Sequence, residues 1–232
     1  GLTALQQNKF AEAARHFQQA QDTAGLGLIA LATHNHRQAS QYFLANNDLS
    51  GQGYAQMGMG DFKKARQYFI AANQLNGLGD LASKLHAFAK AREMFAADNN
   101  PVKVIQSYRN DYTLADRLQQ AIAYGNKALP SGVMVPECLM EMADIHYELG
   151  QIDAALKALD QVIGSHPGYA SEAHLRKGRI YFFQRDLARS KAEFEQVKPD
   201  DLAAEECYDF AQKSLADIAA YQGLNVQAAE SF

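Results

Sequence analysis

Three Gly-x-Gly triplets are the feature of this sequence that most directly suggests chemistry. They lie at Gly25–Gly27, Gly51–Gly53 and Gly77–Gly79, and glycines at a helix start can hold a phosphate with their backbone amides. However, no strand pattern precedes them and no Lys-Ser/Thr pair follows, as a phosphate-binding loop would require. Because the triplets recur at a fixed spacing, we interpret them as turns that mark the starts of successive helices.

The seven histidines and the possible nucleophiles form no catalytic pattern. His34 and His36 are two residues apart and so do not share a helix face, and His146 takes a packing position in a helical pattern. Ser214 and Cys138 also lie within helical patterns, and no Gly-x-Ser-x-Gly elbow or His-Glu-x-x-His motif occurs. We therefore expect no catalytic residue, no metal ligand and no cofactor, and we expect that the chain is not an enzyme.

A repeat of 26 residues organises the first hundred positions. Within each repeat, large and small apolar residues alternate at steps of three, four and three residues, as on one face of a helix. A repeat length of about 26 residues is typical of stacked helical arrays. We expect each alanine to lie where two helices approach closely and each phenylalanine to fill the space toward the next hairpin. The repeated positions are Ala13, Ala39, Ala65 and Ala91, and Phe17, Phe43, Phe69 and Phe95.

The second half keeps the pattern but lengthens the step to about 35 residues. Pro136 can start a helix, Gly150 makes a turn, and Pro167 ends the second helix of this hairpin. A long last helix is predicted from Pro199 to about Tyr221. The stretch 99–132 fits neither step and is expected to be a degenerate repeat or a seam.

The segment Met142–Pro167 resembles a tetratricopeptide repeat (TPR). It has the family's small residues, turn glycine, large apolar residue and closing proline, at Ala143, Gly150, Ala155, Leu159 and Pro167. Gly178–Val197 is similar to the next repeat. The first four units resemble the family too, but its ~34 residues shrink to 26. We expect the first helices, or the loops before them, to be shorter by the missing eight residues, about two helical turns.

This resemblance implies an all-α, right-handed α-solenoid of about seven to eight helix-turn-helix hairpins. Residues 1–98 would form four short repeats, 99–132 the degenerate repeat, and 133–232 longer repeats that stop inside a truncated one. The sequence reads as a piece of a longer array without its native N-terminus, so the compartment, cytoplasm or periplasm, stays open. Apolar residues at its two ends, such as Leu2 and Phe232, predict weak end-to-end self-association.

Charge and cysteine content narrow the possible partners. The formal net charge is -4, with residues 1–100 at +2 and residues 101–232 at -6, so no basic surface for nucleic acid is expected. No run of ~18 apolar residues is present that could insert into a membrane. Cys138 and Cys207 are about two repeats apart, too far for a disulfide, and we expect two free thiols.

The resemblance implies that the first helix of each hairpin lines a concave groove. Four acidic residues of one such helix, spaced by four, three and four, share a stripe that we name the acidic stripe: Glu137, Glu141, Asp144 and Glu148. A bound partner would then carry Lys or Arg, unless the stripe is a solvated face or is neutralised by Arg176 and Arg179. The other groove residues implied are Leu28, Leu31, Tyr54, Met57, Tyr147, Arg176, Arg179 and Phe182, with Phe183 beside the last. The alternative for the leucines is burial between short helices.

The sequence therefore predicts a non-catalytic scaffold or adaptor that binds an extended or helical segment of a partner protein. A second hypothesis is a scaffold part of a bacterial envelope, secretion or polysaccharide-export machine, or the helical domain of an enzyme, that positions another subunit.

Overall fold

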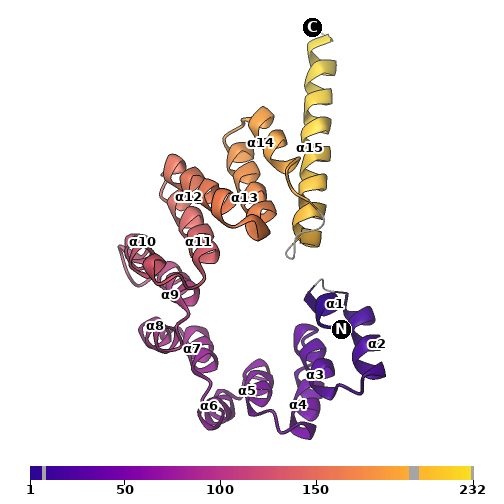
Figure 1. Ribbon diagram of the computed structural model, residues 1–232, viewed down its shortest axis with the longest axis vertical. Coiled ribbons are helices and arrows are strands. Elements are labelled where there is room, and N and C mark those ends of the chain that lie inside the picture. Colours follow the sequence, from indigo (N-terminus) through magenta and orange to yellow (C-terminus); the bar gives the residue numbers. More distant parts are fainter. Residues whose placement is uncertain (7–8, 199–203, 231–232) are drawn as a thin grey trace. The chain divides into compact units, whose positions relative to one another are not determined.

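The structure, a computed structural model, describes residues 1–6, 9–198 and 204–230 of the chain. These residues form fifteen α-helices and two short 3-10 helices, and no strand occurs among them (Figure 1). The predicted all-α fold is thereby confirmed. The chain divides into two compact units, unit 1 (Gly1–Arg117) and unit 2 (Leu118–Phe232). The finer division at 1–98, 99–132 and 133–232 stays a prediction.

Unit 1 is a series of short helices that pack against their neighbours in sequence, antiparallel because the connections are short. From α2 to α8 every helix has ten residues, and every connection has three. The helices are α1 (Leu2–Gln6), α2 (Phe10–Gln19), α3 (Thr23–Ala32), α4 (His36–Ala45), α5 (Leu49–Gly58), α6 (Phe62–Ala71), α7 (Leu75–Lys84), α8 (Phe88–Ala97) and α9 (Pro101–Arg109).

The connections of unit 1 share one backbone geometry, which recurs every 13 residues. The middle residue is left-handed, with φ between 51° and 83°, and the amide of the next residue donates to a carbonyl five residues back, as Asp22 does to Phe17 at 2.8 Å. This Schellman arrangement satisfies the last carbonyls of a helix and reverses the chain. The left-handed residues are Gln21, His34, Asn47, Gly60, Asn73, His86 and Asn99.

Most of these connections end in a side-chain cap. The carboxylate of Asp48, for example, accepts a hydrogen bond from the amide of Gly51 at 2.8 Å, which satisfies an amide that the helix itself leaves unpaired. Equivalent caps recur at the 13-residue step but are absent from α7 and α8, which start after Gln74 and Ala87. The capping residues are Asp22, Asn35, Asp48, Asp61 and Asn100.

The core of unit 1 is built from the repeated alanines and phenylalanines. All four alanines are fully buried, and each phenylalanine is at most 5% exposed. The Phe69 ring lies directly against the backbone of Gly53 in α5 and Gly77 in α7, where an added Cβ atom would collide with the ring. Phe17 and Phe43 each lie between two glycines in the same way.

The interpretation of the Gly-x-Gly triplets as turns is therefore wrong. They occupy the third and fifth positions of ten-residue helices, where two phenylalanine rings need close approach to the backbone. A helical glycine costs up to about 1 kcal/mol relative to alanine, and burial of each aromatic ring offsets this. The amides of Gly25 and Gly51 also donate to Asp22 and Asp48, so these two are not available to a phosphate.

Unit 2 contains longer helices. Its core is mainly aliphatic, with Leu139, Leu159, Val162 and Ile180 packed between α11, α12 and α13. The helices are α10 (Arg117–Ala128), α11 (Val135–Glu148), α12 (Ile152–Ser165), α13 (Ala170–Phe183), α14 (Leu187–Phe194) and α15 (Ala204–Glu230), with 3-10 turns at Leu129–Ser131 and Pro167–Tyr169. Pro136 lies in the first turn of α11, as predicted.

Two expectations about helix length need correction. The eight residues missing from the short repeats are not taken from the first helix alone: α11 and α12 have 14 residues, and both helices of the short hairpins have ten. Both faces of the hairpin therefore shrink together, and the helices remain matched in length. The last helix continues past Tyr221 to Glu230, while its predicted start at Pro199 lies outside the described residues.

Candidate functional site

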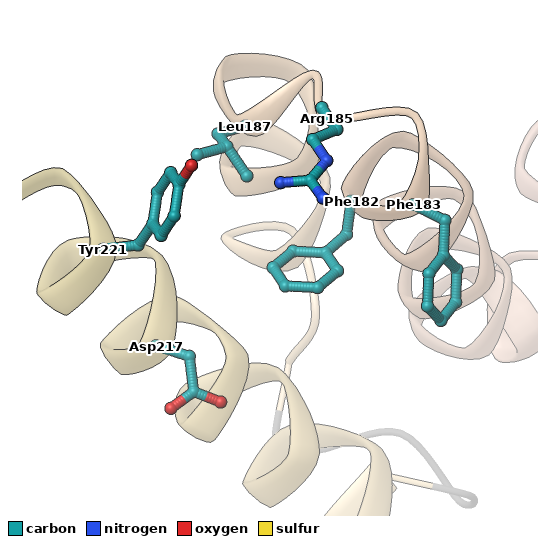
Figure 2. A pocket seen from close by; sticks show the side chains of 6 residues that line it. All are labelled: Phe182, Phe183, Arg185, Leu187, Asp217 and Tyr221. Atoms are coloured by element: carbon teal, nitrogen blue, oxygen red, sulfur yellow. The ribbon is translucent and has the colours of Figure 1, made fainter. Parts of the chain in front are cut away.

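A hollow of unit 2 lies between α13, α14 and α15, and we call it the aromatic cavity. A volume of about 370 Å³ adjoins a smaller one of about 170 Å³, and Phe182 and Asp217 line both. Figure 2 shows the Phe182 ring pointing from α13 toward α15, whereas Phe183 points away from α15. The lining residues are Arg179, Phe182, Phe183, Arg185, Leu187, Phe194, Phe210, Ser214, Asp217 and Tyr221.

Helix α15 forms one wall because of the spacing of its residues. Ala211 and Ile218 are buried against Phe194 and Val197 of α14 and the segment after it, which fixes the rotation of α15 about its axis. A neighbouring stripe then faces the cavity at steps of four, three and four: Phe210, Ser214, Asp217 and Tyr221.

The rings around the cavity remain accessible to solvent. Phe182, Phe210 and Tyr221 are 40%, 47% and 49% exposed, although burial of such rings is usually favourable. The Arg179 guanidinium lies 5.6 Å from the centre of the Phe210 ring, a cation–π contact at the margin of the hollow. The Phe183 ring is 62% exposed and 6.4 Å from the Tyr147 ring, centre to centre.

Part of the acidic stripe of α11 is held by α13 and by the 3-10 turn that precedes it. Arg176 of α13 donates to Asp144 at 2.5 Å and to Glu172 at 2.7 Å. The Tyr169 hydroxyl donates to Glu137 at 2.6 Å, and this hydrogen bond, followed by burial, raises the pKa of Tyr169. Asp144 thus ties α11 to α13, and Glu137 ties α11 to the 3-10 turn Pro167–Tyr169. This supports the scaffolding alternative for these two residues, whereas Glu148 is exposed.

The groove residues predicted in unit 1 lie on neighbouring helices α3 and α5, but most are engaged in packing. Leu31 and Met57 pack against buried clusters, while Leu28 is 41% exposed. The Tyr54 hydroxyl donates to Asp80 at 3.0 Å, and Lys103 donates to the same carboxylate at 2.6 Å. Leu31, Tyr54 and Met57 are thus partly buried and engaged in packing, and their place in a partner-binding groove stays a prediction.

Nothing in the described geometry indicates an activated nucleophile or a metal site. Burial, followed by the charges of Glu137 and Glu141, raises the pKa of Cys138 to about 11, so its thiol stays protonated at neutral pH. Cys138 is free, and the Cys207 side chain lies outside the described residues. In the part of the chain that the structure describes, no group of three His, Cys, Asp or Glu side chains could hold a metal ion, and no helix is long and apolar enough to cross a membrane.

Sequence analysis located one wall of the aromatic cavity and missed the other. Arg179, Phe182 and Phe183 come from the predicted groove helix, but Phe210, Asp217 and Tyr221 were not predicted. A signal for them exists, since the 4-3-4 spacing in α15 is the one that revealed the acidic stripe. However, the α15 stripe adjoins the buried positions Ala211 and Ile218 of the same helix, so the sequence alone does not separate the cavity-facing residues from the buried ones.

Residues 140–203 match the family model of the tetratricopeptide repeat. No curated protein is similar enough to match the chain. The predicted family resemblance is thereby confirmed for this stretch, which includes α12, α13 and α14. Repeats of this kind are typical of protein–protein interaction, and the described chain has the TPR-like all-α architecture that such modules share.

Proposed function

We propose that this chain is a non-catalytic interaction scaffold, in which the aromatic cavity of unit 2 receives an apolar side chain from an extended or helical segment of a partner protein. The observation that carries this proposal is the set of half-exposed rings, Phe182, Phe210 and Tyr221, around one hollow. Aromatic pockets of this kind are where binding energy concentrates in protein interfaces.

The charges near the cavity refine the expected partner. Asp217 and Arg185 lie on opposite sides of the hollow (Figure 2), so they favour a segment that has polar groups of both signs beside its apolar anchor. A partner rich in Lys or Arg, as the acidic stripe predicts, stays part of this proposal. Its support is weaker than the sequence indicates, because Arg176 already neutralises Asp144.

The test is a selection of peptides from a random displayed library on the immobilised chain. The enriched peptides should contain a large apolar residue, and their affinity, measured by fluorescence anisotropy, should fall at least about tenfold with Phe182→Ala or Tyr221→Ala. Tyr112→Ala is the matched control, because Tyr112 of unit 1 is 78% exposed and does not line the cavity. Equal losses with the control would remove the cavity from the proposal.

The alternative, a scaffold that positions a subunit of an envelope, secretion or export machine, uses the same surface but a folded occupant. A photo-crosslinking residue at Tyr221, in cells that produce the full-length protein, separates the two. Crosslinks to a linear segment favour the adaptor, and crosslinks to a folded domain favour the machine component.

A further inference from the structure

Unit 1 contains a groove of its own between α6, α7 and α8, with an apolar lining and cationic side chains. Its volume is about 280 Å³. Leu78, Leu81 and Ala82 of α7 line it, and Ile70 and Leu85 are each 51% exposed. Arg66 and Lys90 add cationic groups, while Ala87 and Met94 complete the lining. We call this the basic-rimmed groove.

The preceding hairpin, 26 residues earlier, has a buried polar side chain where this groove has an apolar one. There Gln52 is buried, its side-chain amide donates to the Ser40 carbonyl at 2.5 Å, and its carbonyl accepts from the Ser40 hydroxyl at 2.8 Å. Leu78 and Arg66 stand at the equivalent positions of the next repeat. This pair cannot make those hydrogen bonds, and both side chains line the groove instead.

The electrostatic character also differs between the two hairpins. Asp61 caps α6 with its carboxylate, whereas Ala87, at the equivalent position, gives α8 no side-chain cap. The first turn of α8 keeps its positive end uncompensated, beside Arg66 and Lys90. Lys90 pairs with Glu93 at 2.6 Å, but both side chains are 62% exposed, and an exposed pair of this kind is weak. None of the described residues that line the groove has a carboxylate.

We propose that the basic-rimmed groove is a docking site for an acidic amphipathic segment of a partner protein. Its apolar side chains would cover Ile70, Leu78 and Leu85, and its carboxylates would lie near Arg66, Lys90 and the start of α8. The apolar lining supplies the burial that stabilises the complex. The positive charges at the rim favour a negatively charged partner and accelerate its association. This site lies in a different unit from the aromatic cavity and requires the opposite partner charge to that predicted by the acidic stripe.

In the experiment, peptides are selected from a random displayed library on the immobilised full chain. The affinity of each selected peptide is then measured for the unmodified chain and for each variant. One class of enriched peptides should combine two or more apolar residues with at least two carboxylates. Its affinity should fall at least about tenfold with Ile70→Glu and with Arg66→Glu. Leu44→Glu is the matched control for Ile70→Glu, because Leu44 occupies the same repeat position, is 65% exposed and does not line this groove. All three positions are exposed, so the variants are expected to fold, which circular dichroism checks.

Three outcomes would overturn the proposal: no acidic class is enriched, Leu44→Glu weakens binding as much as Ile70→Glu, or basic peptides bind equally well. Sedimentation over a range of protein concentrations tests another possible occupant of the groove, a second copy of the chain. If Ile70→Glu abolishes self-association of the chain, the groove holds a second copy and the proposal fails. Peptides that lose affinity with Phe182→Ala report on the aromatic cavity, so the two proposals can fail separately.

Discussion

The two units solve the same packing problem with helices of different length. In unit 1, ten-residue helices bring Phe69 against the backbone of Gly53 and Gly77. In unit 2, aliphatic side chains such as Leu139, Leu159 and Val162 pack with Ala143 and Ala155 between the 14-residue helices α11 and α12. A ten-residue helix is about 15 Å long and a 14-residue one about 21 Å. The shorter helix has fewer side chains to bury, and close approach to an aromatic ring compensates for that.

This difference indicates where each unit is vulnerable. Unit 1 depends on a few repeated contacts between a ring and a glycine, so single substitutions there should have large effects. Unit 2 has one such contact among the residues described, between Phe194 and Gly178, and packs mainly through aliphatic side chains. Single substitutions there should therefore have smaller effects.

The largest effect is expected for Phe69→Ala. Phe69 is fully buried, and its loss leaves a cavity between two glycines that have no side chains to fill it. The free energy of unfolding should fall by about 3–5 kcal/mol, measured by urea denaturation. Phe183→Ala in unit 2, which removes a ring that is 62% exposed, should change it by less than about 0.5 kcal/mol. Similar losses for both would show that the packing of unit 1 is not as described.

The second test makes the same substitution, glycine to alanine, once in each unit, and the expected effects on stability have opposite signs. Gly53→Ala places a methyl group against the Phe69 ring and should destabilise the chain by about 1–3 kcal/mol, despite the better helix propensity of alanine. Gly164→Ala in α12 meets nothing within 4 Å and should be neutral or stabilising by up to about 1 kcal/mol. Thermal and urea unfolding would measure both. A stabilising Gly53→Ala would contradict the close approach of ring and backbone.

The third prediction concerns pH. Burial raises the pKa of Glu193, but the contacts with His174 and Lys177, each 2.7 Å from its carboxylate, outweigh burial and hold that pKa below its ordinary value of 4.5. Its contribution is therefore present above about pH 4.5 and is lost as pH falls through the lowered pKa.

The matching experiment compares Glu193→Gln with the unmodified chain across that range. The variant should lose about 1.5–3 kcal/mol at pH 7, as expected for hydrogen bonds to a charged group, and should show a flatter acid dependence than the unmodified chain. Glu12→Gln, at a side chain that is 56% exposed, is the control and should leave the curve unchanged. An unchanged acid dependence in Glu193→Gln would contradict this role.

The smallest effect is expected at the left-handed positions of unit 1. His86 has a φ of 57°, a conformation that costs a non-glycine residue roughly 1–2 kcal/mol. His86→Gly should stabilise the chain by about 0.5–1 kcal/mol, since glycine also gains freedom in the unfolded state. Gly60→Ala, at the equivalent position with a φ of 83°, should have the opposite sign. Equal signs in thermal unfolding would show that the connections are not equivalent.

Sequence analysis predicted the repeat and its core because the same two residue types, alanine and phenylalanine, recur at the positions where the space between helices is tightly limited. It missed the 13-residue step, since the connections need only tolerate one backbone conformation, which glutamine, histidine, asparagine and glycine all adopt here. It placed the Gly-x-Gly triplets in turns because glycine is common there, and only tertiary contact shows their role against the rings.

The candidate site was less predictable than the fold. Phe182 could be assigned to a groove helix from the repeat, but the aromatic cavity also requires α15 to pack on α14 through Ala211 and Ile218. That contact lies outside the repeat pattern. The ion pair that holds Asp144 and the hydrogen bond that holds Glu137 likewise depend on which rotamers bring Arg176 and Tyr169 within reach, which spacing alone does not specify.

The uniform connections of unit 1 also bear on how the chain is made. Each helix from α2 to α8 packs on the helices immediately before and after it, so the partners it needs lie within a few tens of residues. Contacts that are local in sequence form quickly, and translation delivers ≈ 5–20 residues per second. A hairpin of unit 1 can therefore assemble as soon as it leaves the ribosome, and each finished hairpin provides the surface on which the next one folds.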